Sequence, residues 1–180
     1  MTGKSEGVSV RVLVCDLDGT LLRANSFRWW VIYWTFTGLL HPPFWWRWCA
    51  VPLKRLSRRI EREEMKAELM AVYTNYEQRL PLTLRRSFSR LLLLMVRKDV
   101  AEFLGQKRSE GFVGVLATAA PRLYLADIIR RYGFRWAVGS YLEAGTLVET
   151  MGAIKSRAVM AFIEAQGVPR EECFIIAVTD

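Results

Sequence analysis

The sequence predicts an α/β protein with a Rossmann-like parallel sheet, helices on both faces of that sheet, and an all-helical cap inserted after the first strand. Three observations lead to this prediction. Short apolar runs that suit buried parallel strands, among them RVLVC, FVGVLA and FIIAV, each end at polar residues. Segments with helical patterns separate these runs in the second half of the chain. A long segment with helical spacing interrupts the alternation directly after the first run.

The size and composition suit one domain with a substantial core and a small insertion. The chain has 180 residues, 52% of them hydrophobic, and a mean hydropathy of +0.11. The first ten residues are mostly polar and contain no apolar secretory core. Cys15, Cys49 and Cys173 are widely spaced and form no C-x-x-C pattern. We therefore expect a cytoplasmic protein without a disulfide framework or a zinc site.

The first strand is predicted over Arg11 to Cys15 and is followed by two carboxylates, in the stretch RVLVCDLDGTLL. Asp16 and Asp18 are two residues apart, so in an extended chain both side chains project to one side while Leu17 points away. Gly19 then allows the backbone to turn sharply. Two aspartates can also simply decorate a turn, but the full D-x-D-G-T pattern after a strand favours a functional site.

The segment after Leu22 is predicted to be helical. Residues 26–40 are almost continuously apolar and aromatic, and the breaker His41-Pro42-Pro43 separates them from a second apolar run over 44–53. Apolar residues recur at helical spacing from Arg55 to Leu80, where Pro81 ends the pattern, and Thr83 to Val96 forms a further helix. We therefore expect a helical cap over residues 23–97 and a Rossmann-like core made of residues 1–22 and 98–180.

The α/β pattern resumes at Lys98. The expected elements, in order, are a helix over 98–110, a strand over 112–117, a helix over 121–131 ended by Gly133, a strand over 134–138, a hairpin over 141–150 around Ala144-Gly145, a helix over 153–166, and a strand over 174–178. The apolar strands then end at Asp16, Thr118 and Thr179-Asp180. In an open parallel sheet these ends meet where ligands bind.

The stretch around Asp16 resembles the first motif of the haloacid dehalogenase superfamily, whose members are mostly magnesium-dependent phosphatases. The resemblance implies that Asp16 attacks phosphorus and that Asp18 is the general acid and base. A carboxylate can form an acyl phosphate, which divides a difficult displacement into two easier ones. A second carboxyl group is needed to protonate the leaving oxygen and then deprotonate water.

The later motifs are similar to those of the same superfamily. Thr118 resembles the hydroxyl residue that holds a phosphate oxygen, although a threonine at a strand end is more often structural. Lys155 resembles the lysine that offsets negative charge during transfer, and Asp180 the aspartate that helps to bind Mg²⁺. The implied magnesium ligands are the Asp16 carboxylate, the Asp18 carbonyl oxygen, Asp180 and waters, a donor set that suits a hard cation.

The helical insertion resembles the phosphoserine phosphatase branch, but the sequence departs from that branch in two places. Asn25 stands where those enzymes carry a glutamate for the substrate amine, and Ala119-Ala120 replaces a glycine pair. The fourth motif normally continues beyond its first aspartate, whereas this chain stops at Asp180. The resemblance therefore implies a truncated chain whose substrate is not phosphoserine.

Charge and tryptophan are both concentrated in the cap region. The net charge is +8, and residues 47–108 contain fifteen Lys and Arg against seven Asp and Glu. Such a segment can meet anionic lipid or a phosphorylated substrate, or form a solvated helical face, whereas diffuse charge alone does not predict nucleic-acid binding. Six of the seven tryptophans fall between positions 29 and 48. They either pack the cap or seat it in a membrane interface: Trp29, Trp30, Trp34, Trp45, Trp46 and Trp48, with Lys54, Arg55, Arg58 and Arg59 near anionic headgroups.

The leading hypothesis is a Mg²⁺-dependent phosphatase that acts through an aspartyl-phosphate, with a phosphorylated small molecule or a lipid-linked phosphate as substrate. The catalytic residues are Asp16 and Asp18, Thr118 and Lys155 bind phosphate, and Asp16, Asp18 and Asp180 bind the metal. The alternative is a catalytically incomplete domain that serves as a membrane-interface or partner-binding module, at the cytoplasmic face of a membrane. Transfer of the phosphoryl group to an acceptor other than water stays open.

Overall fold

The computed structural model describes residues 11–165 and 174–179. Their central element is a five-stranded sheet with the strand order β4-β3-β2-β1-β5. The strands are β1 (Arg11–Cys15), β2 (Val113–Pro121), β3 (Trp136–Glu143), β4 (Thr146–Val148) and β5 (Phe174–Val178). β1 pairs in parallel with both β2 and β5, and β2 pairs in parallel with β3. The predicted α/β fold is therefore present, with its first strand at the predicted residues.

The edge strand β4 is antiparallel and comes from the predicted hairpin. Tyr141 pairs with Val148 across a turn at Ala144 and Gly145. Both turn residues have positive φ, 48° for Ala144 and 83° for Gly145, which matches the right-handed twist of a two-residue hairpin. This hairpin carries Glu149 and Thr150 toward the carboxyl ends of the parallel strands.

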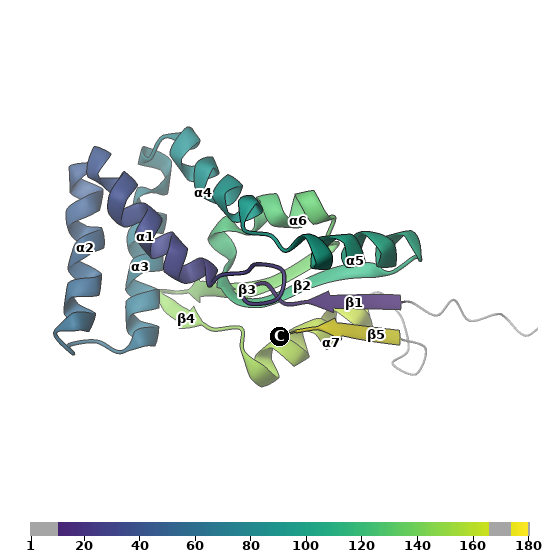
Figure 1. The fold of residues 1–180 in the computed structure, drawn as a ribbon. Coiled ribbons are helices and arrows are strands. Elements are labelled where there is room, and N and C mark those ends of the chain that lie inside the picture. The colour runs from purple at the N-terminus through teal and green to yellow at the C-terminus, as the bar shows by residue number, and fades with distance from the viewer. Residues whose placement is uncertain (1–10, 166–173, 180) are drawn as a thin grey trace, which may run out of the picture.

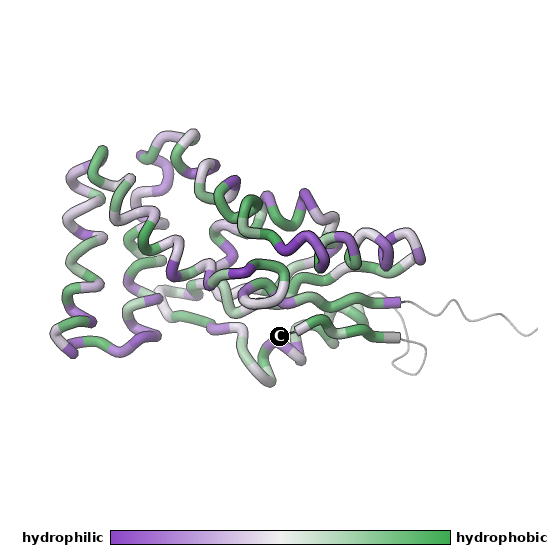
Figure 2. The backbone as a smooth tube through the Cα atoms, in the orientation of Figure 1, coloured by the Kyte–Doolittle hydropathy of each residue, from purple (hydrophilic) through white to green (hydrophobic). Residues whose placement is uncertain are grey.

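Helices cover both faces of the sheet (Figure 1). One face packs on α5 (Lys98–Ser109) and α6 (Ala126–Tyr132), and its core includes Leu13 and Leu116. The opposite face packs on α7 (Gly152–Ala165), whose Phe162 and Ile163 contact Val12 and Val115. Because alternate residues of β1 and β2 serve the two faces, both strands are almost continuously apolar (Figure 2).

Four helices stand between β1 and α5 in the chain and lie beyond the carboxyl ends of β1 and β5 (Figure 1). They are α1 (Ser26–Thr37), α2 (Pro42–Leu56), α3 (Arg62–Tyr76) and α4 (Leu82–Leu94). Short 3₁₀ turns at Gly38–Leu40 and Glu77–Arg79 follow α1 and α3, and a third at Arg122–Tyr124 precedes α6. None of the helices described between residues 11 and 165 combines the length and apolar character needed to cross a bilayer.

Several predicted boundaries differ from the structure, most clearly in this helical region and in β2. The helix predicted to run from Arg55 is broken, since α2 ends at Leu56 and Arg58 has a φ of 57°. α3 begins only after Glu61, whose carboxylate and that of Glu64 form a reciprocal capping box. β2 continues past Ala117 to Pro121, so Thr118 lies within the strand and the helix predicted from Pro121 starts at Ala126.

The extension of β2 has a tertiary cause. The Ala119 carbonyl accepts hydrogen bonds from Ser140 Oγ at 2.7 Å and from Lys66 Nζ at 2.7 Å. Pairing between β2 and β3 shifts register between Ala117 and Pro121. These contacts come from residues distant in the sequence, so local propensity did not predict them.

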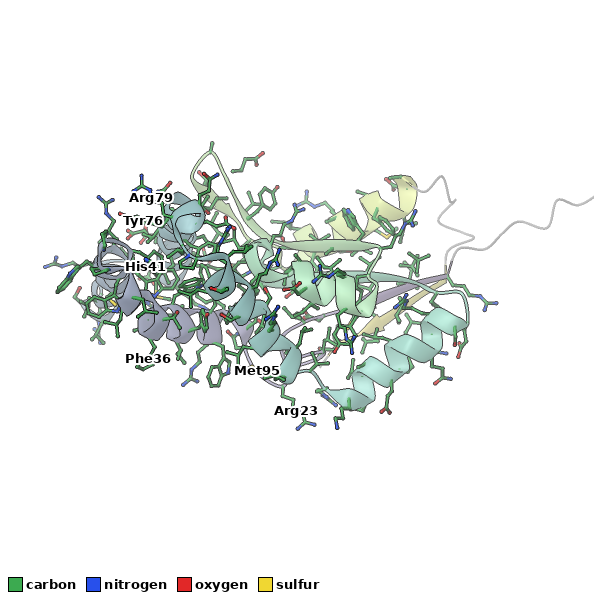
Figure 3. The ribbon with its side chains drawn as sticks, turned by 90° about the horizontal axis from the view of Figure 1, so that it is seen from above. Arg23, Phe36, His41, Tyr76, Arg79 and Met95 are labelled. Atoms are coloured by element: carbon green, nitrogen blue, oxygen red, sulfur yellow. The ribbon has the colours of Figure 1, made fainter. Side chains whose placement is uncertain are left out.

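Some of the tryptophans in these helices are buried in the core and others are exposed. Trp30, Trp34 and Trp48 are buried, together with Phe44, and their rings contact one another and Tyr73 at centroid distances of 5.0–5.5 Å. The interpretation that all six tryptophans seat the cap in a membrane is therefore wrong for these three. Trp46, by contrast, is 69% exposed. Phe36 also projects away from the neighbouring helices (Figure 3).

Candidate active site

Asp16 lies at the first position after β1, where the strand ends. Its backbone N–H donates to the Val178 carbonyl at 3.1 Å, which continues the pairing with β5 by one residue. Its carboxylate accepts from the Leu17 N–H at 2.7 Å through Oδ1 and pairs with Lys155 Nζ at 2.9 Å through Oδ2. One oxygen is thus fixed by the backbone while the other faces a cation, so both oxygens of the carboxylate are held in place.

Asp18 is held by the start of the first cap helix. Its Oδ1 accepts from the Ser26 N–H at 2.8 Å, and Ser26 Oγ hydrogen-bonds to Tyr124 Oη at 3.0 Å. Burial raises the pKa of the Asp18 carboxyl above its ordinary value of 3.8, and the hydrogen bond from Ser26 opposes this shift more weakly. A raised pKa favours the protonated acid, the form that can donate a proton to a leaving group.

Thr118 and Lys155 reach the same place from two other elements. Thr118 is buried in β2, and its Oγ1 accepts from the Ala120 N–H at 3.1 Å. The hydroxyl proton remains available to donate to a phosphate oxygen. Lys155 lies in the first turn of α7, where its ammonium group adds to the positive end of the helix.

These four predicted side chains line one pocket of about 240 Å³. Its lining comes from the turn after β1, the end of β2, and the segment that leads from β4 into α7: Asp16, Asp18, Asn25, Thr118, Ala119, Thr150, Met151, Gly152 and Lys155. The pocket therefore lies at the carboxyl ends of the parallel strands, the position that the sequence predicted for the site.

The predicted metal ligand Asp180 lies outside the described residues. Within residues 11–165 and 174–179, no three His, Cys, Asp or Glu side chains converge on one point. The candidate ligands that are described, the Asp16 carboxylate and the Asp18 carbonyl, are both oxygens of residues that line this pocket. An all-oxygen donor set beside open space fits Mg²⁺, which keeps several waters and takes one or two carboxylates.

Lys66 is a residue of this region that the sequence analysis missed. It projects from α3, is only 6% exposed, and donates to the Ala119 carbonyl and to Glu149 Oε1, the latter at 2.5 Å. The signal was present, because Lys66 occupies an inward-facing position of α3 together with Leu69, Met70 and Tyr73. A lysine at such a position requires a polar partner, but the sequence could not identify Glu149.

Asn25 has a local structural role. Its Oδ1 accepts from the Arg28 N–H at 2.8 Å and so caps the first turn of α1. The residue also lines the pocket next to Asp18.

Solved structures share this fold at low sequence identity. A protein of unknown function from Bordetella pertussis Tohama I matches with a TM-score of 0.71 and 17% identity, over 92% of this chain and 79% of that one. A HAD family hydrolase from Salmonella enterica serovar Typhi matches with a TM-score of 0.59 and 11% identity, over 93% of this chain and 55% of that one. A substrate-bound phosphoserine phosphatase matches with a TM-score of 0.56 and 9% identity, over 93% of this chain and 77% of that one.

The sequence comparisons differ in their outcome. No curated protein matches the sequence. The family model for haloacid dehalogenase-like hydrolases matches residues 13–180, a range that includes the aspartates after β1, Thr118 and Lys155. With this match over most of its length and the fold described above, the chain belongs to the haloacid dehalogenase-like hydrolases.

Proposed function

We propose that this protein is a magnesium-dependent phosphatase that hydrolyses phosphoric monoesters through an aspartyl-phosphate on Asp16. The observation that carries the proposal is the Asp16 carboxylate, which is fixed by the Leu17 N–H and paired with Lys155 in a pocket that Asp18 and Thr118 also line. Each of the four groups has chemistry that phosphoryl transfer requires.

The first half of the reaction forms the covalent intermediate. An Asp16 carboxylate oxygen attacks phosphorus as the bond from phosphorus to the ester oxygen breaks, and protonated Asp18 gives its proton to that oxygen. Thr118 donates a hydrogen bond to a phosphoryl oxygen, and the Lys155 ammonium balances the negative charge of carboxylate and phosphoryl group.

The second half returns the enzyme to its starting state. Ionised Asp18 takes a proton from water as the water oxygen attacks phosphorus, and the bond from phosphorus to Asp16 breaks to release inorganic phosphate. Bound Mg²⁺, held by the Asp16 carboxylate, the Asp18 carbonyl and Asp180, would supply further positive charge at the phosphoryl oxygens.

We propose that residues 23–97 form a cap over a core of residues 1–22 and 98–180, and that the cap selects the substrate. α3 contributes Lys66 to a cleft that also includes Asp18 and Glu149. A cap in this position would exclude water from the phosphoryl group.

The test is release of phosphate from an aryl phosphate, with Mg²⁺ or with EDTA, by the wild-type protein and by Asp16→Asn. We expect metal-dependent release that the substitution lowers by at least about a thousandfold, since no other side chain replaces a lost nucleophile. Equal release by Asp16→Asn, or release that EDTA does not affect, would refute the mechanism.

A second proposal concerns contact with an anionic membrane through the outer face of α2, defined as Pro43, Trp46, Ala50 and Leu53. These four residues are exposed and recur at helical spacing, with Trp46 at 69% and Leu53 at 63% exposure. The exposed cations Arg47, Lys54 and Arg58 lie on or next to this face. An apolar face flanked by cations suits an interface with anionic headgroups.

Vesicle flotation tests this second proposal. The protein should float with vesicles that contain phosphatidylserine and less with phosphatidylcholine alone, and Trp46→Ser with Leu53→Ser should abolish binding. Leu82→Ser with Leu94→Ser, at exposed leucines of α4, provides the matched control. Flotation that both pairs of substitutions reduce equally would count against a role for α2.

A further inference from the structure

The pocket at Asp16 is the first of three adjoining depressions. It shares Asp18, Asn25, Ala119 and Met151 with a cleft of about 480 Å³ below the start of α3. That cleft in turn shares Asn25, Phe27 and Arg62 with a groove that runs between α1 and α3. The α1–α3 groove therefore lies within reach of a molecule whose phosphate is at Asp16, with one adjoining cleft between them.

The α1–α3 groove has apolar walls. Phe27, Val31 and Ile32 of α1 and Met65 of α3 line it, and all four side chains are half-buried. Phe27 and Val31 lie one helical turn apart, so they form a strip along α1 that starts beside the cleft. An apolar group that covers such half-buried side chains removes their surface from water, which makes its binding more favourable.

The rim of the groove is positively charged. Arg28, Arg55 and Arg62 line it, and Arg55 donates to the Ile60 carbonyl and pairs with Glu61. Neither Arg28 nor Arg62 has an ion-pair partner among residues 11–165 and 174–179. Two unpaired guanidinium groups favour an anionic molecule over a neutral or cationic one at this entrance.

We propose that the substrate is an amphiphilic phosphoric monoester whose apolar chain lies in the α1–α3 groove while its phosphate lies at Asp16. The groove adjoins the cleft beside the pocket, which argues for a part of the substrate as occupant, and the apolar walls argue for a hydrocarbon chain. The cationic rim favours the approach of an anionic molecule. This inference rests on the proposed phosphatase function and specifies its substrate class.

Binding of alkylphosphonates tests the inference, because they are not hydrolysed and need no turnover. Butylphosphonate and octylphosphonate are titrated calorimetrically into the protein with Mg²⁺, below the concentrations at which they form micelles. Full burial of a methylene group strengthens binding about fourfold and partial burial about twofold. We therefore expect octylphosphonate, with four more methylenes, to bind at least about tenfold more tightly than butylphosphonate.

Substitutions in the groove test whether the dependence of affinity on chain length arises there. Ile32→Ser and, separately, Met65→Ser should lower the ratio of the two affinities by at least about twofold, because each removes part of an apolar wall. Leu82→Ser, an exposed leucine outside the groove, should keep the wild-type ratio. The use of two groove variants guards against the failure of either one to fold.

Three results would overturn the inference. Equal affinity for the two phosphonates, with the aryl phosphate still hydrolysed, refutes the chain site and leaves the phosphatase proposal intact. A chain-length effect that Leu82→Ser reduces as much as Ile32→Ser refutes the location. Binding of neither phosphonate, together with no hydrolysis of the aryl phosphate, refutes the proposed function and the inference with it.

Discussion

Asp18 lies in surroundings that favour its neutral form, and this has a consequence for stability. Burial raises the pKa of its carboxyl group in the folded protein, while in the unfolded chain the group has its ordinary pKa. The folded state therefore binds more protons at this site. The contribution of Asp18 to stability is fully present below about pH 3.8 and is lost as the pH rises through the raised pKa of the folded protein.

Asp18→Asn should therefore gain stability relative to the wild type as the pH rises. The amide oxygen can still accept from the Ser26 N–H, but it carries no charge that burial disfavours. The measurement is the urea unfolding free energy of both proteins at pH 4 and pH 8. A difference that stays constant, or that moves in favour of the wild type at pH 8, would show that burial does not raise the pKa of Asp18.

Lys66 connects α3 to the sheet through three acceptors, and its removal should be costly. Its ammonium group donates to the Ala119 carbonyl, Ser140 Oγ and Glu149 Oε1. Lys66→Met leaves Glu149 without its cation, so we expect a loss of about 2–3 kcal/mol in the free energy of unfolding.

The exposed pair of Lys54 on α2 and Glu68 on α3 provides the control for Lys66. Their side chains are 46% and 36% exposed, so Lys54→Met should cost less than about 0.5 kcal/mol. Urea denaturation at pH 7 compares the two variants. Equal losses would mean that Lys66 is no more important to the fold than a surface lysine.

The sequence predicted four of the residues that line the pocket at Asp16. It did not predict the contacts made by residues of the helices that stand over that pocket. Asp16 and Asp18 form a dense local pattern, and Lys155 has a position set by the order of elements. Lys66 and Glu149 are 83 residues apart, and no local pattern pairs them. The structure was also needed to show that the Asn25 amide caps α1.

α2 carries one buried and one exposed tryptophan two residues apart. Trp48 is fully buried, stacks on Phe44 at 5.3 Å and meets the edge of Trp30 at 5.0 Å. Trp46, two residues earlier, points to the solvent side of the same helix.

Alanine at these two positions should therefore have very different effects. Trp48→Ala should lower the unfolding free energy by about 3–5 kcal/mol, because it leaves a cavity in the aromatic cluster. Trp46→Ala should change it by less than about 0.5 kcal/mol. Thermal or urea denaturation followed by circular dichroism distinguishes them. Similar losses for both would show that the outer face of α2 is packed against something that stabilises the fold.

The sequence predicted which segments are helices or strands better than it predicted the residues at which they begin and end. The strand at Arg11–Cys15 and the helix that starts at Lys98 form where local pattern placed them. The break between α2 and α3 depends on a positive φ at Arg58, which no turn residue announces. The extended backbone at Ala119 depends on hydrogen bonds from Lys66 and Ser140, so β2 passes beyond its apolar run.

Across the fold, the path of the chain explains where the site forms. β1 delivers two carboxylates to the end of the sheet, and the chain leaves at once into the helices that stand over that end (Figure 1). The chain returns through α5 to β2, which brings Thr118, and α7 brings Lys155 from the opposite face. Residues far apart in the sequence meet because parallel strands end at one edge.

The basic charge of the molecule is concentrated in the helices between β1 and β2. The excess of Lys and Arg over Asp and Glu in residues 47–108 equals the net charge of +8. α2, α3, α4 and α5 carry most of these cations. An excess of positive charge attracts anionic molecules to the protein, and added salt weakens that attraction.

Chemical trapping of the intermediate is the most direct test of Asp16 as nucleophile. The protein is mixed with an aryl phosphate and Mg²⁺, treated with borohydride, digested, and analysed by mass spectrometry. Borohydride reduces an acyl phosphate on aspartate to homoserine, so we predict homoserine at position 16, only when substrate is present, and unchanged aspartate at position 18. Phosphate release without homoserine at position 16, or with homoserine at position 18 instead, would contradict the account.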